Sequence, residues 1–170
     1  MKIAITGHTS GIGLALYTHY SRDNQVIGFS RSTGHDITLS PTRHLIAMQT
    51  IDCDVIINNA YSNHDDSQLE LLKLLVANSN PKQIIINISS RYTTDSYPYC
   101  QAKLNLDRYC ESQVFNRQVK LVNIKPGLVD TPRVANNTGP KVSTSDLITV
   151  IEFAISNIDK FTIHTVCFGQ

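Results

Sequence analysis

The 170-residue sequence has almost no net charge. Its 15 Lys and Arg nearly balance its 14 Asp and Glu, giving a formal charge of +1 at pH 7, and the basic residues are scattered along the chain. Such a balance creates no field that would attract nucleic acid or an anionic membrane surface. We therefore expect a small-molecule partner, with neither nucleic acid nor membrane as a binding partner.

Long hydrophobic runs and paired cysteines are also missing. No apolar run approaches the length of a membrane span, which is about 20 residues. The cysteines form no CxxC pair and show no metal-like spacing with His, and no secretory signal fits, because the chain opens on a strand-like segment. We expect a cytoplasmic protein without a metal site and with free thiols at Cys53, Cys100, Cys110 and Cys167.

Short segments rich in Val and Ile alternate with stretches of helical length. The near-continuous hydrophobicity of the short segments is typical of parallel strands covered by helices on both faces. The pattern predicts one α/β domain over residues 1–170, a doubly wound, Rossmann-like parallel sheet of about seven strands in the order 3-2-1-4-5-6-7. The third strand is expected to be very short and to begin near Asp36. The other expected strands are residues 2–6, 25–29, 54–59, 83–89, 119–124 and 162–168.

The glycine-rich segment TGHTSGIG, residues 6–13, follows the first expected strand directly. The first strand of a doubly wound sheet ends beside the ligand crevice. Without side chains at Gly7, Gly11 and Gly13, the backbone can approach a pyrophosphate, whose charge the N-terminal amides of the next helix would meet. The segment predicts a dinucleotide site, although glycines at such a turn can also be turn chemistry alone.

The end of the second strand indicates which dinucleotide binds. An NAD site places an acidic residue about 20 residues beyond the glycines to bond the ribose 2′-hydroxyl, whereas a 2′-phosphate favours a guanidinium. Ser30 and Arg31 stand at this place. NADP(H) is therefore favoured over NAD(H), with a solvated loop charge as the alternative role of Arg31. Asp36 could accept the adenine amino group or bond its own backbone in a turn.

Tyr99 and Lys103 lie four residues apart, on one face of a helix that follows a strand ending in two serines. A nearby ammonium favours a phenolate and lowers the pKa of a phenol, and a serine hydroxyl can hold a substrate oxygen. We predict Tyr99 as acid and base, Lys103 as the residue that lowers its pKa, and Ser90 as the partner of the substrate oxygen. Taken singly, Tyr99 could be a helix-start packing residue, Lys103 a solvent lysine and Ser90 a turn residue.

Together, these ordered motifs resemble the short-chain dehydrogenase/reductase family over essentially the whole chain. Five segments resemble motifs of the family: TGHTSGIG resembles the glycine motif, NNA (58–60) resembles NNAG, NISS (87–90) resembles the serine strand, YCQAK (99–103) resembles YxxxK, and PGLVDTP (126–132) resembles the PG motif. The resemblance implies an NADP(H)-dependent oxidoreductase that reduces a small carbonyl compound, or oxidises the alcohol, by hydride transfer. It implies Ser90, Tyr99 and Lys103 as catalytic residues. It implies a cofactor site of Gly7, Thr9, Ser10, Gly11, Ile12, Gly13, Arg31, Asp36, Ile37, Asn59, Ala60, Tyr99, Lys103, Pro126, Gly127, Val129 and Thr131.

The chain departs from the family pattern around the reacting groups. Ser90 precedes Tyr99 by only nine residues, so Ser89 is an alternative. Tyr61 replaces the glycine of NNAG and would line the substrate pocket or simply pack. The asparagine that the family often uses in proton relay has no clear counterpart here, and Asn63 and Asn78 are weak candidates.

The chain is also shorter than family members commonly are. The segment over residues 130–143 is brief, so we expect a reduced substrate loop and a small, open pocket or one completed by a neighbouring subunit. A homodimer or homotetramer could form through the YxxxK helix, whose apolar residues could equally face the sheet. These residues are Leu104, Leu106, Tyr109 and Val114.

Two other functions remain open. The first is an NADP(H)-binding sensor or interaction protein that has the fold without turnover. The second is a sugar-nucleotide epimerase or dehydratase, suggested by SYPYCQAK at residues 96–103. The 39 residues after Thr131 leave no room for the substrate domain that such enzymes carry.

Overall fold

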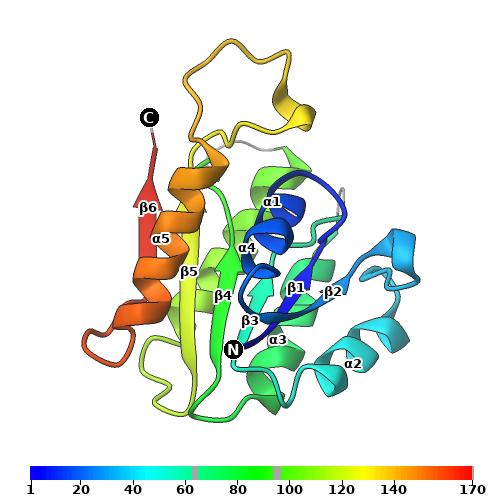
Figure 1. The fold of residues 1–170 in the computed structure, drawn as a ribbon, viewed down its shortest axis with the longest axis vertical. Coiled ribbons are helices and arrows are strands. Elements are labelled where there is room, and N and C mark those ends of the chain that lie inside the picture. The colour runs from blue at the N-terminus through cyan, green and yellow to red at the C-terminus, as the bar shows by residue number, and fades with distance from the viewer. Residues whose placement is uncertain (63–64, 94–96, 170) are drawn as a thin grey trace.

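The computed structural model describes residues 1–62, 65–93 and 97–169. One six-stranded sheet runs through this part of the chain, and all of its strand pairs are parallel (Figure 1). The strand order is β2-β1-β3-β4-β5-β6. The strands are β1 (Lys2–Thr6), β2 (Gln25–Phe29), β3 (Val55–Asn58), β4 (Ile84–Ile88), β5 (Lys120–Pro126) and β6 (Thr165–Phe168).

Helices cover both faces of the sheet, as the predicted doubly wound architecture requires. The helices α1 and α5 pack on one face, and α2, α3 and α4 pack on the other (Figure 1). None of the helices in the described part of the chain is long and apolar enough to cross a membrane. The helices are α1 (Gly11–Tyr20), α2 (Ser40–Gln49), α3 (Ser67–Asn78), α4 (Pro98–Ser112) and α5 (Thr144–Asn157), with short 3₁₀ turns η1 (Arg31–Thr33) and η2 (Pro132–Val134).

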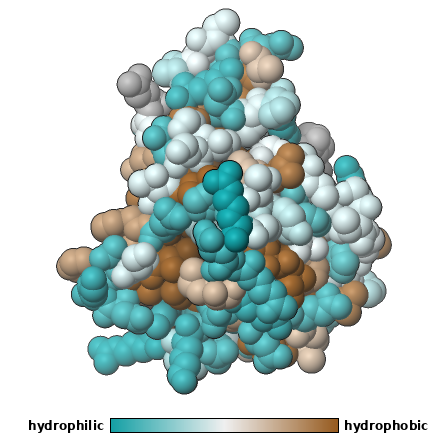
Figure 2. Space-filling model, viewed as in Figure 1, coloured by the Kyte–Doolittle hydropathy of each residue, from teal (hydrophilic) through white to brown (hydrophobic). Residues whose placement is uncertain are grey.

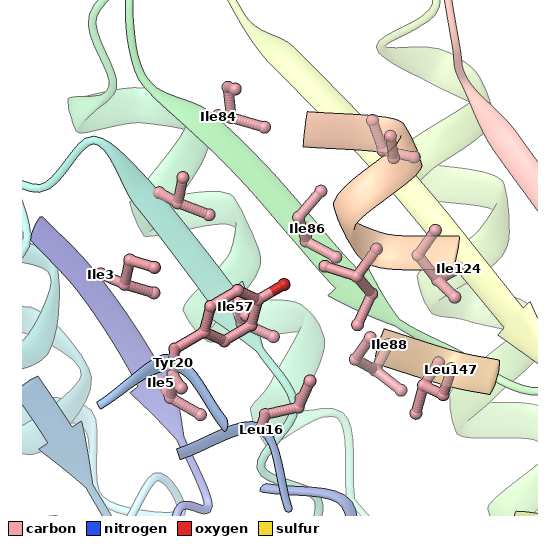
Figure 3. Close-up of a cluster of buried hydrophobic side chains, with 14 of the residues drawn as sticks. Ile3, Ile5, Leu16, Tyr20, Ile57, Ile84, Ile86, Ile88, Ile124 and Leu147 are labelled. Atoms are coloured by element: carbon pink, nitrogen blue, oxygen red, sulfur yellow. The ribbon is translucent and has the colours of Figure 1, made fainter. Parts of the chain in front are cut away.

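Alternate residues of each central strand enter two separate cores. Ile3 and Ile5 of β1 point toward α1 and α5, where Figure 3 shows them close to Leu16 and Tyr20. Ala4, between them, joins the core under α2, α3 and α4. Because both faces are covered, both sets of side chains must be apolar. This explains the continuous hydrophobicity of the strands in the sequence.

The predicted third strand near Asp36 is absent, which reduces the expected seven strands to six. Asp36 Oδ1 accepts hydrogen bonds from the backbone N of Thr38, at 3.0 Å, and from Thr38 Oγ1, at 2.9 Å. These bonds hold the pKa of Asp36 below its usual range, and they close a turn that leads directly into α2. The remaining strands keep the predicted order.

Helix α4 presents part of its apolar surface to the sheet. Leu106 is buried in the core, and Tyr109 packs against the same cluster. Leu104 and Val114 are only partly buried. Two of the four residues considered for a subunit contact therefore face the core, and a homodimer or homotetramer stays a prediction.

The segment that follows β5 leaves the sheet and closes on itself through one bridge outside the strands of the sheet before α5 begins. Val129 pairs with Val142, and the backbone N of Asp130 donates to the carbonyl of Val142 at 2.8 Å. Between these points the chain rises beyond the ends of the strands and carries η2 (Figure 1). Figure 2 shows mostly hydrophilic to neutral residues at this end of the molecule. The segment therefore packs little apolar surface and stands beside the site described next.

Candidate active site

A cleft of about 1010 Å³ lies at the carboxyl ends of β1, β2, β3 and β4, and α4 and η2 complete its walls. Strand β1 has β2 on one side and β3 on the other, so the cleft lies at the switch point where doubly wound sheets bind ligands. Most of the predicted site residues line it. They are Gly7, Thr9, Ser10, Gly11, Ile12, Arg31, Asp36, Ile37, Asn59, Ala60, Tyr99, Lys103 and Thr131.

The three glycines of the first turn have different roles. Gly7 and Gly11 have φ angles of 74° and 51°, which side chains disfavour. A Cβ on Gly11 would project toward the Thr131 side chain, 3.8 Å away, and so would enter the cleft between them. A Cβ on Gly13 would lie 2.1 Å from the carbonyl oxygen of Gly7. Gly13 therefore lets α1 pack on the turn and does not itself line the cleft.

The start of α1 is suited to an anion. The side chain of its N-cap residue, Ser10, makes no capping hydrogen bond, and the first turn holds no acidic residue. The first amides of the helix can thus serve a phosphate. Thr6 Oγ1 ties the turn to the end of β3, because it accepts hydrogen bonds from the backbone N atoms of Asn59 and Ala60, both at 2.9 Å. The residues present fit the pyrophosphate of a dinucleotide.

Hydroxyl groups gather at the end of β2. Ser30 Oγ lies 3.0 Å from Ser32 Oγ, and Ser32 Oγ donates to Thr9 Oγ1 at 3.1 Å. Arg31 is exposed and lines the cleft beside them. This end therefore offers hydroxyls and a guanidinium, which are groups that bind phosphate oxygens. No group of three His, Cys, Asp or Glu side chains that could hold a metal ion occurs among the residues that the structure describes.

The opposite end of the cleft brings two tyrosines and a lysine together. The rings of Tyr61 and Tyr99 meet edge to face, with centroids 5.1 Å apart. Lys103 Nζ lies 5.1 Å from the Tyr61 ring centroid and 5.8 Å from that of Tyr99. Arg133 of η2 lines the same end. Tyr61 thus does both things considered for it, because it lines the cleft and packs on Tyr99.

Lys103 is almost completely buried. Its Nζ donates to Gln68 Oε1 at 2.7 Å and to the carbonyl oxygen of Ile88 at 3.0 Å. Burial lowers the pKa of Lys103 to about 7, and the Asp107 carboxylate opposes this shift. Burial therefore brings the pKa of Lys103 close to neutral pH.

The direction of the Tyr99 pKa corrects a prediction. We expected the Lys103 ammonium to lower it, and the structure shows it raised, because burial disfavours the phenolate. The hydrogen bond with Ser90 lowers the pKa but does not outweigh burial. The charge of Arg133 also lowers the pKa without reversing the shift. Tyr99 is a neutral phenol at neutral pH.

The two serines at the end of β4 are placed differently. Ser90 is buried, hydrogen-bonds Tyr99, and its Oγ accepts from the backbone N of Tyr92 at 3.0 Å. Ser89 lines the cleft, and its buried Oγ has no hydrogen-bond partner within the described ranges. The geometry therefore keeps Ser90 as the partner of Tyr99 and Ser89 as a second candidate for the substrate oxygen.

Three residues predicted from the PG motif lie outside the cleft walls. Pro126 ends β5, the backbone N of Gly127 donates to the carbonyl of Phe168 at 2.8 Å, and Val129 is buried in the core. They are held by β6 and by the pairing with Val142. Of the four residues predicted from this motif, Thr131 lines the cleft. The predicted contact of the other three with the cofactor stays a prediction.

Gln68 was missed by the sequence reasoning, although it is the amide that reaches Lys103. Two asparagines were considered for proton relay. Asn78 donates to the Leu74 carbonyl at the end of α3, and Asn63 lies outside the described residues. Gln68 is in the first turn of the helix that follows NNA. A glutamine there is unremarkable in sequence, so only the fold shows its position.

Comparison with known proteins finds similarity in structure but not in sequence. No protein-family model matches the sequence, and no curated protein is significantly similar to it. The 3-alpha-hydroxysteroid dehydrogenase from Pseudomonas sp. B-0831, complexed with NADH, superposes with a TM-score of 0.79 at 17% identity, over 99% of this chain and 94% of that one. This chain has the short-chain dehydrogenase fold.

Two further structures share the short-chain dehydrogenase fold with this chain. One is a short-chain dehydrogenase from Burkholderia cenocepacia J2315 in complex with NADP, with a TM-score of 0.75 and 16% identity over 99% of this chain and 88% of that one. The other is a 3-oxoacyl (acyl-carrier-protein) reductase from Agrobacterium tumefaciens C58 with NADP bound, with a TM-score of 0.78 and 15% identity over 98% and 92%. These chains share a fold at low sequence identity.

The buried Lys103 should make stability depend on pH. Its pKa is about 7 in the folded chain and about 10.4 when unfolded. Between these values the unfolded state binds the extra proton, so the free energy of unfolding should rise as pH rises from 7 to 9. The slope of the free energy of unfolding against pH should approach the limit for the uptake of one proton on unfolding. In Lys103→Met this slope should be smaller. Urea unfolding of both proteins at pH 7, 8 and 9 measures this, and parallel curves would contradict it.

Proposed function

We propose that this chain is a short-chain dehydrogenase/reductase that reduces a small carbonyl compound with NADPH. The observation that carries the proposal is that one cleft joins the glycine turn and the start of α1 to Tyr99 and Lys103. The structural similarity to proteins whose structures contain NADH or NADP supports the proposal. A homodimer or homotetramer, a cytoplasmic location and the absence of nucleic-acid and membrane partners stay predictions.

The cofactor would supply hydride to the substrate carbon when bound. The turn at Gly7 and Gly11 and the start of α1 would hold its pyrophosphate. Arg31 and the hydroxyl of Ser32 would hold a 2′-phosphate, and the third donor of the Lys103 ammonium would bond to a ribose hydroxyl. These roles use groups that line the cleft.

The protonation state of Tyr99 favours reduction over oxidation. A phenol whose pKa is raised by burial is neutral near pH 7, so it can donate its proton to the carbonyl oxygen as that oxygen gains charge. Ser90 or Ser89 would donate a hydrogen bond to the same oxygen. The protonated form of Lys103, 5.8 Å from the ring centroid, would then stabilise the phenolate that Tyr99 becomes.

A second function, NADP(H) binding without turnover, is favoured by one observation. The Tyr61 ring lies against both Tyr99 and Lys103, where it takes space that a substrate would need. In such a sensor the nucleotide would bind and the tyrosine would have no chemical role. Replacement of Tyr99, discussed below, separates the two functions.

The first test is a titration of the purified protein with NADPH and NADH, followed by nicotinamide fluorescence. We expect tighter binding of NADPH, and we expect Arg31→Asp to weaken NADPH binding by about 10- to 100-fold because a charge-assisted bond to phosphate is lost. NADH binding should change little. Arg22→Asp is the control. Arg22 is exposed and lies outside the cleft walls, and its replacement by Asp changes the net charge by the same amount as Arg31→Asp.

Two outcomes would contradict these proposals. If neither nucleotide binds, both the reductase and the sensor are wrong. If Arg31→Asp weakens NADPH and NADH equally, Arg31 does not hold a 2′-phosphate, and the preference for NADP(H) has no support from this residue.

A further inference from the structure

A line of four buried amide residues connects Lys103 to Asp107. Lys103 Nζ donates to Gln68 Oε1 at 2.7 Å, and Gln68 Nε2 donates to the carbonyl oxygen of Asn58 at 2.9 Å. Asn58 Nδ2 donates to Asn87 Oδ1 at 3.0 Å. Asn87 Nδ2 then donates to Asn123 Oδ1 at 2.8 Å, and Asn123 Nδ2 donates to Asp107 Oδ1 at 2.7 Å. All six residues are at most 4% exposed. We call Gln68, Asn58, Asn87 and Asn123 the amide chain.

The chemistry of its two ends fixes the direction of the amide chain. An ammonium only donates hydrogen bonds and a carboxylate only accepts them. Gln68, Asn87 and Asn123 must therefore turn their side-chain oxygens toward Lys103 and their NH₂ groups toward Asp107. Gln68 is fixed independently, because its two N–H groups donate to the carbonyls of Asn58 and Ile88, both at 2.9 Å. Every bond in the amide chain therefore runs from the Lys103 side to the Asp107 side, an arrangement in which the bonds strengthen one another.

Other charged and titratable groups compete at both ends. Asp107 Oδ2 also pairs with Lys125 Nζ at 2.6 Å, and the Lys125 side chain is 20% exposed. Asp107 therefore faces one cation directly and another through the amide chain. The groups that face the two ends are Tyr61, Tyr99 and Arg133 at Lys103, and Lys125 and Cys110 at Asp107.

We propose that Asp107 is a positioning residue that acts on Lys103 through the amide chain and favours its ammonium form over the neutral amine. A buried ammonium is unfavourable unless an anion compensates it. Asp107 is the carboxylate that opposes the effects of burial and Arg133 on Lys103, and it lies one helical turn along α4 on the same face. The hydrogen bonds of the amide chain join the two groups and all run from Lys103 toward Asp107. The catalytic consequence alone rests on the proposed function, because a neutral Lys103 could not stabilise a Tyr99 phenolate.

The test is to titrate the lysines of the full chain by NMR with ¹³Cε-labelled lysine. The Lys103 resonance is assigned by its loss in Lys103→Arg. We expect its midpoint to fall by about one pH unit or more in Asp107→Asn, which keeps the shape of the side chain and removes its charge. We expect the midpoint to rise in Gln68→Glu, which places a carboxylate against Nζ. Opposite shifts from the two variants are not expected of residues that only fill space.

An unchanged Lys103 midpoint in Asp107→Asn would overturn the proposal. If that variant does not fold, Asp107→Asn combined with Lys125→Met, which leaves no unpaired ammonium, is compared with Lys125→Met alone. The midpoint should again be lower in the variant that lacks Asp107, and equal midpoints would overturn the proposal. The readout does not need activity, so a shifted midpoint in a protein that shows no turnover supports the coupling while contradicting the proposed function.

Discussion

Replacement of Tyr99 by Phe should reduce carbonyl reduction by about 100- to 10,000-fold, the usual contribution of a general acid. The substitution removes the hydroxyl proton that would pass to the substrate oxygen and leaves the ring packed on Tyr61. NADPH affinity should therefore stay almost unchanged. The measurements are NADPH oxidation with a panel of small aldehydes and ketones, and a fluorescence titration of the same protein.

Tyr61→Phe is the matched control for this experiment. Tyr61 lines the same cleft, packs on the Tyr99 ring and, like Tyr99, lies beside Lys103. Phenylalanine keeps the ring beside Lys103, so turnover should remain within about tenfold of the original. Equal turnover in the original protein and in Tyr99→Phe would remove Tyr99 from the chemistry. Tight NADPH binding without any turnover in the original protein would favour the sensor function.

Replacement of Gly13 by Ala should destabilise the fold and abolish NADPH binding together. The added Cβ would lie 2.1 Å from the Gly7 carbonyl oxygen and 2.8 Å from Asn59 Nδ2, distances that no side chain tolerates. Helix α1 must then move away from the turn. We expect a loss of about 1 to 3 kcal/mol or more in the free energy of unfolding, as for other overpacked sites. Urea unfolding and an NADPH titration measure both effects.

Gly34→Asn is the control for Gly13→Ala. Gly34 has a φ of 84°, but a Cβ there meets nothing within 4 Å, and Asn tolerates this conformation better than other residues. This variant should keep both its stability and its NADPH binding. A stable Gly13→Ala protein that binds NADPH as before would show that the contact between α1 and the turn can relax, and that it does not position the site.

Most of the fold could be predicted from the sequence because both faces of the sheet are covered. Ile3, Ala4 and Ile5 all had to be apolar, and this produces a recognisable run. The third strand was wrongly predicted because a short polar segment carries no such constraint. There, the hydrogen bonds of Asp36 with Thr38 close a turn. Asp36 also lines the cleft, so its contact with an adenine stays a prediction.

The cleft was predictable where function depends on local spacing and unpredictable where it depends on burial. Tyr99 and Lys103 share a helix face because they are four residues apart, and Gly7 and Gly11 follow a strand end. The pKa of Tyr99 was predicted in the wrong direction, because spacing shows which charges are near but not how much solvent is lost. Gln68 could not be found, because its contact with Lys103 joins two helices across a strand end.

The pairing of Val129 with Val142 makes the intervening segment a replaceable module. The bridge brings the two ends of the segment together beyond the end of β5, so the length between them is decoupled from the register of β5 and β6. Loop closure costs rise slowly with length, by about 0.6 kcal/mol for each doubling. Longer segments could be grafted between these two valines, and the chain offers a minimal scaffold on which new covers for the cleft can be engineered or can evolve.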